Sequence, residues 1–334
     1  MKIGPVVDLI NYREYSTRFE KCFGEALSVA EIHLLHSDTV SRDGFFTSIQ
    51  ESSSYFRDMG LEKLAYHLLD DVINDVILHD LIRHRPEFKN LIPPTDPAVA
   101  KDQLKLLMEA MELASEKFGR EIVAVVHEGI FLNTVDLESM EPDLLPGLRN
   151  LFFDKIENIH SRYFSNHSDG VAIYLENSPP FRGTGIDVQH FTDQLVVDIV
   201  PRLRGSEKLV FDISHGFMCR HYFESKERES FGLNLFRKLF RDKGNIDVPM
   251  NDYPEISAII PFIGWIHLND CSGIYGDHEG LPLFQMESLV DWTKTIPLLK
   301  KMDMPMILEI RSAEKDFSFL EKSLKNFRET WEAK

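Results

Sequence analysis

Histidine and acidic side chains close a series of short apolar segments along the chain. AIYLE and LVFD end in a carboxylate, and IVAVVH ends in an imidazole. Burial of such groups without partners costs free energy, and clustered carboxylates also repel one another. A divalent cation relieves both effects, and mixed oxygen and nitrogen ligands suit zinc or manganese, with magnesium and cobalt as alternatives. The candidate ligands are His67, His127, Glu176, Asp212, His215, His267 and Glu309.

The strands and helices that must position these residues are predicted from the pattern of apolar residues. Several are rich in valine and isoleucine without polar interruption, as parallel strands covered on both faces are. Amphipathic stretches between them predict helices over residues 102–118, 146–159, 188–203, 231–240, 289–299 and 317–331. The expected strands span residues 2–10, 28–34, 61–67, 122–127, 171–176, 209–212, 264–268 and 306–309.

Eight strands that mostly alternate with helices predict an α/β fold, a closed (β/α)8 barrel. Strand carboxyl ends meet at one mouth of such a barrel, so the scattered candidate ligands would become neighbours. A single histidine or acidic residue at a strand end would be interpreted as the cap of a loop or helix. A metal centre is favoured because such residues recur at the ends of six strands. An open doubly wound sheet is the alternative, but it needs a glycine-rich turn after the first strand, and the sequence has none there.

Chain length and net charge limit the number of domains and the kinds of binding partner. The 334 residues suit a single barrel domain over 1–334, with insertions at about 69–96 and 217–257. A net charge of −17 argues against a nucleic-acid partner unless bound metal offsets it. Three scattered cysteines indicate reduced thiols in a cytoplasmic protein, and no apolar run is long enough to span a membrane. A homo-oligomer stays an open alternative.

Short motifs occur in a fixed order from the third expected strand to the eighth. They are YHLL at 66–69, VVHEG at 125–129, YLEN at 174–177, FDISH at 211–215, HLND at 267–270, DHEGLPL at 277–283 and LEI at 308–310. In their order and spacing these motifs resemble the xylose-isomerase-like barrel superfamily. This superfamily includes sugar and sugar-phosphate isomerases and epimerases, and the type IV apurinic/apyrimidinic endonucleases (AP endonuclease family 2).

The resemblance implies one to three metal ions. The epimerase pattern places one ion on Glu176, Asp212, His267 and Glu309. The endonuclease pattern adds a second zinc on His67, His127 and Glu176. A third zinc would use His215 and an Asp-x-His pair, but here Asp277 and His278 are adjacent in the sequence.

Two enzymatic functions follow from this resemblance. In a sugar, sugar-phosphate or polyol isomerase or epimerase, Glu176 or Glu309 would move the proton next to a metal-polarised carbonyl, and His215 would hold a substrate oxygen. Asp277 and His278 would close the mouth or bind a hydroxyl, and Arg182 is either a solvated loop residue or a clamp for a substrate carboxylate or phosphate.

The alternative is a zinc-dependent, endonuclease-like phosphodiesterase. The presence of His67 and His127 favours it, because an epimerase with one metal does not need them. A barrel that binds a small molecule without turnover is the third hypothesis. The remaining histidines of interest have no comparable setting and are expected on the surface or in packing positions: His33, His36, His79, His84 and His160.

Overall fold

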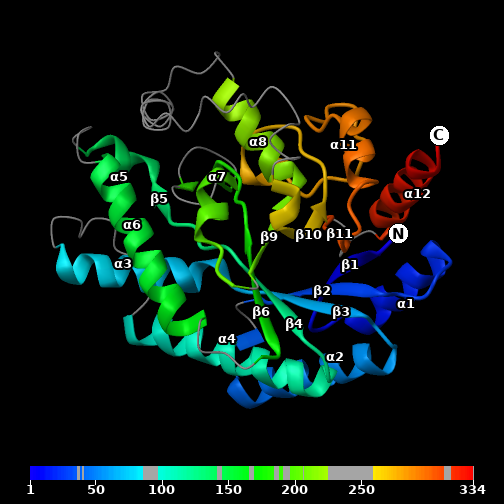
Figure 1. The fold of residues 1–334 in the computed structure, drawn as a ribbon, viewed down its shortest axis with the longest axis horizontal. Coiled ribbons are helices and arrows are strands. Elements are labelled where there is room, and N and C mark those ends of the chain that lie inside the picture. The colour runs from blue at the N-terminus through cyan, green and yellow to red at the C-terminus, as the bar shows by residue number, and fades with distance from the viewer. Residues whose placement is uncertain are drawn as a thin grey trace.

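Eight parallel strands close into a barrel in the computed structural model (Figure 1), which confirms the predicted α/β barrel. The structure describes residues 1–35, 38–39, 41–85, 97–140, 145–164, 169–183, 188–190, 196–205, 207–224, 259–311 and 317–333. The strands around the barrel are, in chain order, β1 Ile3–Asp8, β2 Val29–His33, β3 Lys63–His67, β4 Ile122–Val126, β6 Val171–Glu176, β9 Lys208–Asp212, β10 Ile263–Leu268 and β11 Met306–Leu308. The first and last strands pair directly, and the amide of Met306 donates to the carbonyl of Lys2 at 2.9 Å.

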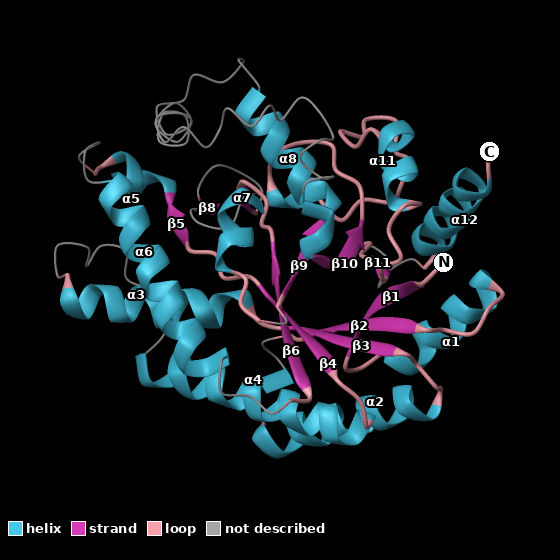
Figure 2. Cartoon of the chain, viewed as in Figure 1, coloured by secondary structure: helices cyan, strands magenta, loops and turns pink. Residues whose placement is uncertain are grey.

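Helices surround the strands on the outside (Figure 2). Those of the described residues are α1 Tyr12–Phe23, α2 Arg42–Asp58, α3 Asp70–His84, α4 Pro97–Phe118, α5 Thr134–Glu138, α6 Leu145–Ile159, α7 Val196–Ile199, α8 Ile213–Glu224, α11 Trp292–Leu299 and α12 Ser318–Glu332. Among them, none has the length and apolar character needed to cross a membrane.

The barrel has two apolar layers, as strands covered on both faces require. The larger layer packs the outer strand faces against the helices. The smaller one takes in-phase residues from the strands alone and fills the barrel lumen, with Trp265 fully buried in it. Its members are Val29, Ala65, Val123, Val125, Ala172, Tyr174, Val210, Trp265 and Ile307.

The lumen residues explain why the candidate ligands converge. Side chains two positions apart on a strand share a face, so a residue two places after a lumen residue lies one layer nearer the mouth. Glu176 follows Tyr174 in this way, and Asp212 follows Val210. The same step leads from Ala65, Val125, Trp265 and Ile307 to His67, His127, His267 and Glu309.

One sequence prediction about the connections is wrong. The stretch 188–203 begins as a strand, β8 Val188–His190, and the described part of helix α7 is Val196–Ile199. β8 pairs antiparallel with β5 Phe131–Asn133 and with β7 Phe181–Arg182. Gln189 of β8 is buried and donates to the hydroxyl of Tyr222 at 3.1 Å, so tertiary partners outweigh local helical periodicity here.

The expected insertions are only partly described. Helix α3 fills the first part of the insertion predicted at 69–96, and residues 86–96 lie outside the described residues. Helix α8 covers the start of the second insertion. The expected helix at 231–240 lies outside the described residues, as do His36 and the side chain of His84.

Candidate metal centre

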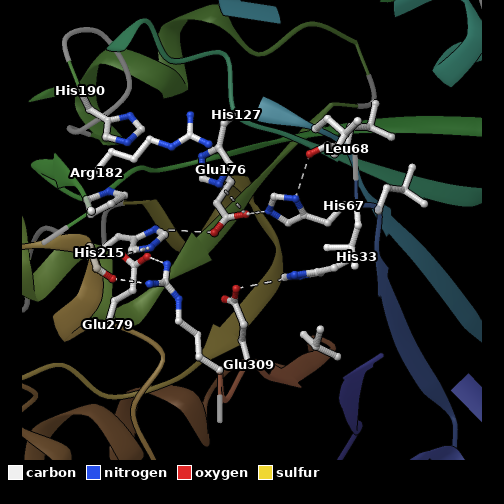
Figure 3. Close-up of a pocket in the computed structure, with 18 of the residues that line it drawn as sticks. His33, His67, Leu68, His127, Glu176, Arg182, His190, His215, Glu279 and Glu309 are labelled. Atoms are coloured by element: carbon white, nitrogen blue, oxygen red, sulfur yellow. Dashed lines mark hydrogen bonds and ion pairs between the residues drawn. The ribbon is translucent and has the colours of Figure 1, made fainter. Parts of the chain in front are cut away.

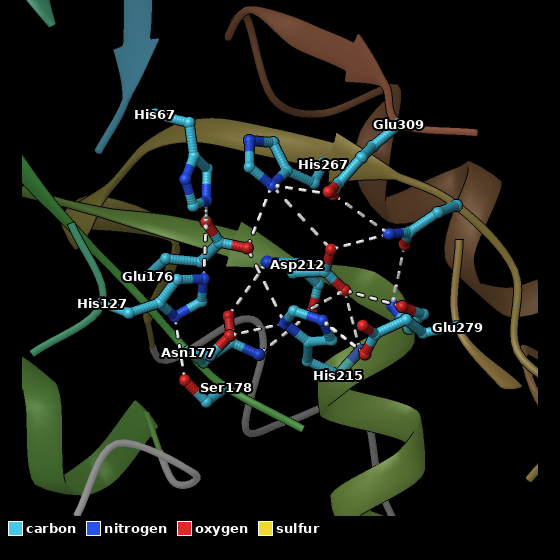
Figure 4. A network of polar contacts seen from close by, with 12 residues as sticks. His67, His127, Glu176, Asn177, Ser178, Asp212, His215, His267, Glu279 and Glu309 are labelled. Atoms are coloured by element: carbon cyan, nitrogen blue, oxygen red, sulfur yellow. Dashed lines mark hydrogen bonds and ion pairs between the residues drawn. The ribbon is translucent and has the colours of Figure 1, made fainter. Parts of the chain in front are cut away.

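Glu176 lies at the centre of a buried polar network at the barrel mouth (Figure 4). Its side chain is 1% exposed. Its Oε1 lies 3.0 Å from Nδ1 of His267, and its Oε2 lies 3.0 Å from Nε2 of His67 and 3.4 Å from Nε2 of His127. Each carboxylate oxygen of Glu176 therefore faces a different set of candidate ligands.

The first set consists of Glu176, Asp212, His267 and Glu309. One ligand atom of each lies within 4.8 Å of all the others. Nδ1 of His267 is 3.2 Å from Oε2 of Glu309 and 3.8 Å from Oδ2 of Asp212. The amide of Asn269 donates to both of these carboxylates, at 3.2 and 2.8 Å, and so fixes their spacing.

The second set consists of His67, His127 and Glu176. Nδ1 of His67 faces the carbonyl of Leu68 at 3.1 Å, and Nδ1 of His127 faces the hydroxyl of Ser178 at 2.8 Å. An Nδ1–H that donates in this way leaves the Nε2 lone pair directed at Glu176, and metal-binding histidines are commonly oriented by such bonds. The two sets share Glu176, as a two-metal site would require.

The electrostatics of the first set favour a bound cation. Burial opposes ionisation of Glu176 and Glu309, but the charge of His267 outweighs it, so the pKa of Glu176 lies well below its usual value and that of Glu309 falls to about 2. Burial raises the pKa of Asp212, despite the charge of His215, and the charges of Glu309 and Glu176 add to the increase. Burial alone would lower the pKa of His267, but the surrounding carboxylates raise it well above its usual value. Carboxylates thus outnumber the positive charge, and these residues fit a divalent metal.

Two residues of β2 belong to this network although sequence reasoning missed them. Glu31 is fully buried and lies 2.9 Å from Nε2 of both His33 and His267. His33 lines the pocket, with its Nε2 4.0 Å from Oε1 of Glu309, so its expected role as a surface or packing residue is wrong. Glu31, His33 and His67 also form a third set with ligand-like spacing. The available signal was the period of two, because residues 29, 31 and 33 share one strand face.

The imidazole of His215 pairs more closely with Glu279 than with the candidate metal ligands. Its Nδ1 donates to the carbonyl of Asn177 at 2.7 Å, and its Nε2 lies 2.9 Å from Oε2 of Glu279, which also pairs with Arg311. Its Nδ1 is 3.7 Å from Oε1 of Glu176. Within the described residues, the sets with ligand-like spacing do not include His215. It is held at the edge of the network by a buried carboxylate that the sequence analysis had not singled out.

Asp277 and His278 lie in a 3-10 turn, Gly276–His278. Their side chains are 43% and 39% exposed, and Nε2 of His278 is 3.7 Å from Oδ1 of Asp277. Neither is among the described residues that line the pocket, whereas their neighbours Gly276 and Glu279 are. The DHEG motif therefore brings its glutamate, rather than its Asp-His pair, to the cavity.

A cavity of about 380 Å³ opens above the network (Figure 3). Leu34, Leu35 and Leu69 contribute an apolar wall. The network residues that line the cavity are Glu176, Glu309, His33, His67, His127 and His215. β7 and β8 of the small sheet contribute Arg182 and His190. Cavities of this size usually hold small molecules.

Comparisons with known proteins agree with the fold. No family model matches the sequence, and no curated protein matches it. A protein described as a xylose isomerase, from Rhodospirillum rubrum, is 14% identical with a TM-score of 0.57, over 100% of this chain and 99% of that one. The mannonate dehydratase of Streptococcus suis is 9% identical with a TM-score of 0.57, over 99% and 94%. A protein described as a 3-DHS dehydratase, AsbF of Bacillus anthracis, is 11% identical with a TM-score of 0.51, over 98% of this chain and 99% of that one.

The fold is that of the xylose-isomerase-like (β/α)8 barrels. At these identities the likeness establishes the architecture and does not assign a reaction. The chemistry must be argued from the residues at the mouth.

Proposed function

We propose that this protein is a divalent-metal-dependent isomerase or epimerase of a small carbohydrate-like substrate. The observation that carries the proposal is the convergence of Glu176, Asp212, His267 and Glu309, of which Glu176 and Glu309 line a small-molecule-sized cavity. The xylose isomerase and the dehydratases of the same fold give the comparison that supports it. The isolated cysteines Cys22, Cys219 and Cys271 support a cytoplasmic location.

Glu309 is better placed than Glu176 to move a proton. A divalent cation bound by the first set would polarise a substrate carbonyl and acidify the neighbouring C–H bond. Glu309 is 20% exposed and lines the cavity, and its Oε1 faces His33 across 4.0 Å. Glu176 is nearly fully buried, and both of its oxygens lie at 3.0 Å from an imidazole. We therefore assign the general base, and the acid that returns the proton, to Glu309.

Arg182 is the proposed binding group for an anionic end of the substrate. Its guanidinium lies over the Phe131 ring, 4.4 Å from the ring centre, and this contact holds it at the cavity wall. A guanidinium can grip a carboxylate or a phosphate with two parallel hydrogen bonds. We propose on this basis that the substrate is a sugar phosphate or a sugar acid. His215 stays a proposed contact for a substrate hydroxyl, whereas Asp277 and His278, which do not line the cavity, stay proposed residues for closing its mouth.

A zinc-dependent phosphodiesterase is the second candidate. The specific observation in its favour is that His67 and His127 face the second oxygen of Glu176, because an enzyme with one metal does not need them. Two cations would clamp the attacking and leaving oxygens of a phosphodiester. The net charge of −17 weighs against a nucleic-acid substrate.

Two measurements separate these candidates. Metal analysis of the purified protein should give one ion per chain for the isomerase, and two or three zinc ions for the phosphodiesterase. Turnover of sugar phosphates in deuterium oxide should place deuterium next to the carbonyl. Failure to incorporate the label under turnover would exclude the isomerase, and nicking of abasic duplex DNA would establish the endonuclease. If neither activity exists and Glu309→Gln leaves ligand binding intact, a barrel that only binds its ligand is the remaining function.

A further inference from the structure

Glu31 makes three short contacts from the barrel lumen. It is fully buried on β2, one layer below the candidate metal centre. Its Oε2 accepts from the indole Nε1 of Trp265 at 2.8 Å and lies 2.9 Å from Nε2 of His267. Its Oε1 lies 2.9 Å from Nε2 of His33. Both oxygens are therefore already occupied by nitrogen groups of the protein.

These contacts argue against Glu31 as a metal ligand itself. Oε2 of Glu31 accepts from the indole N–H of Trp265, which cannot bind a metal. A cation shared with His33 and His67 would also compete with Glu176 for Nε2 of His67, which lies 3.0 Å from Oε2 of Glu176. Glu31 contacts both Trp265 and His267, which lie on the same strand, β10. This arrangement suits a residue that orients the side chain of His267.

We propose that Glu31 is a positioning residue that aims the Nδ1 of His267 at the metal. A carboxylate can only accept from Nε2, so Glu31 would keep a proton on Nε2 of His267 and leave Nδ1 as the nitrogen that gives up its proton when a metal binds. That nitrogen faces Glu176 at 3.0 Å and Glu309 at 3.2 Å. A carboxylate behind a ligating histidine both fixes its orientation and increases its basicity. The inference rests on the proposed metal centre.

The test measures metal affinity rather than activity. Zinc or cobalt alone is titrated into the protein in competition with a chromophoric chelator, for wild type, Glu31→Gln and Glu128→Gln. Glutamine keeps the volume of Glu31, but its NH2 group must then face one of the donors from Trp265, His33 or His267. Glu128→Gln is the matched control, because Glu128 is buried and lies 2.9 Å from Nε2 of His160, outside the first set.

Glu31→Gln should bind zinc about 10- to 100-fold more weakly, and Glu128→Gln should bind as wild type does. The visible spectrum of bound cobalt should also change in Glu31→Gln, because the imidazole is no longer fixed. Equal affinity in wild type and Glu31→Gln, or an equal loss in both variants, would overturn the inference and leave the metal centre standing. Wild type that binds no metal would overturn the proposed function as well.

A measurement on wild type keeps the proposal testable if Glu31→Gln does not fold. Nuclear magnetic resonance of the zinc-loaded protein with isotope-labelled histidine distinguishes a protonated ring nitrogen from a metal-bound one. We expect His267 to carry its proton on Nε2 and zinc on Nδ1. The reverse assignment would contradict the role of Glu31.

Discussion

Nε2 of His67 lies 3.0 Å from Oε2 of Glu176, although the two residues are 109 positions apart in the chain. The contact exists because β3 and β6 both contribute their last residue to the same mouth of a closed barrel. A centre with one metal would use Glu176 but not His67, so the contact joins the two candidate sets. The number of bound ions therefore becomes the most informative property of this protein.

Removal of His67 should separate the two candidate metal positions. In His67→Ala, a protein that holds two ions should lose one, because the first set does not contain His67. Glu176→Gln should lose both, since Glu176 belongs to both sets. Metal analysis after dialysis provides the measurement, and His221→Gln, an exposed histidine of α8, is the control. If His67→Ala and wild type contain the same number of ions, His67 is not a ligand.

Chelation should lower the thermal stability of the metal-loaded protein. Metal that binds only the folded state stabilises it by about 4 kcal/mol at a free concentration about 1,000 times the Kd. Addition of a chelator should therefore lower the Tm by several degrees, and zinc or manganese should restore it. Glu309→Gln should show a smaller response. Identical melting curves with and without chelator would count against the metal centre.

The close packing at Gly264 should make β10 sensitive to a single methyl group. A Cβ at Gly264 would lie 2.6 Å from the Tyr174 ring and 2.7 Å from Cβ of Lys208. Gly264→Ala should lower the free energy of unfolding by about 1–3 kcal/mol, because the lumen must rearrange. Gly147→Ala is the control, since Gly147 lies in α6 with no atom within 4 Å of an added Cβ, and there alanine should stabilise by about 0.5–1 kcal/mol. Denaturant unfolding of both variants gives the comparison, and equal effects would show that the contact at Gly264 is not restrictive.

The Glu128–His160 pair should make stability depend on pH. Burial by itself lowers the pKa of His160, but the hydrogen bond and charge of Glu128, and the charge of Glu207, outweigh it and raise the pKa. Because the folded pKa is raised, the contribution is fully present below about pH 6.5, the unfolded pKa of histidine, and is lost as the pH rises through the folded value. Glu128→Gln should cost about 3–5 kcal/mol at low pH and flatten the dependence above about pH 6.5. Unfolding free energies that fall equally steeply with pH in wild type and Glu128→Gln would contradict this.

Arg182 should discriminate between charged and neutral ligands. Arg182→Gln should weaken binding of a sugar phosphate about 10- to 100-fold, because a charge-assisted hydrogen bond contributes about 1.5–3 kcal/mol. Binding of the corresponding neutral sugar should hardly change. Arg182→Lys should recover little of the loss, since lysine lacks the planar group that stacks on Phe131. Calorimetric titration of wild type and both variants with each ligand provides the measurement, and equal losses for both ligands would refute an anion-binding role.

The sequence by itself determined the eight barrel strands and the residues at their ends. Apolar runs such as Ile122–Val126 predict buried strands, because a strand covered on both faces must be apolar throughout. A polar residue two positions beyond a lumen residue must then share its face, so Glu176 and Asp212 could be placed at the mouth before any coordinates.

Only the tertiary structure decided which polar residues face one another. The period of two places Glu31 on the strand face of Val29 and His33, but nothing local in the sequence identifies His267 as the partner of Glu31 or His215 as the partner of Glu279. The strand at Val188–His190 depends likewise on β5 and β7 rather than on its own sequence. Propensity is local, whereas a hydrogen bond between distant segments depends on barrel closure, which fixes their distance and direction. The contacts of Glu31 behind the candidate metal centre therefore became visible only in three dimensions.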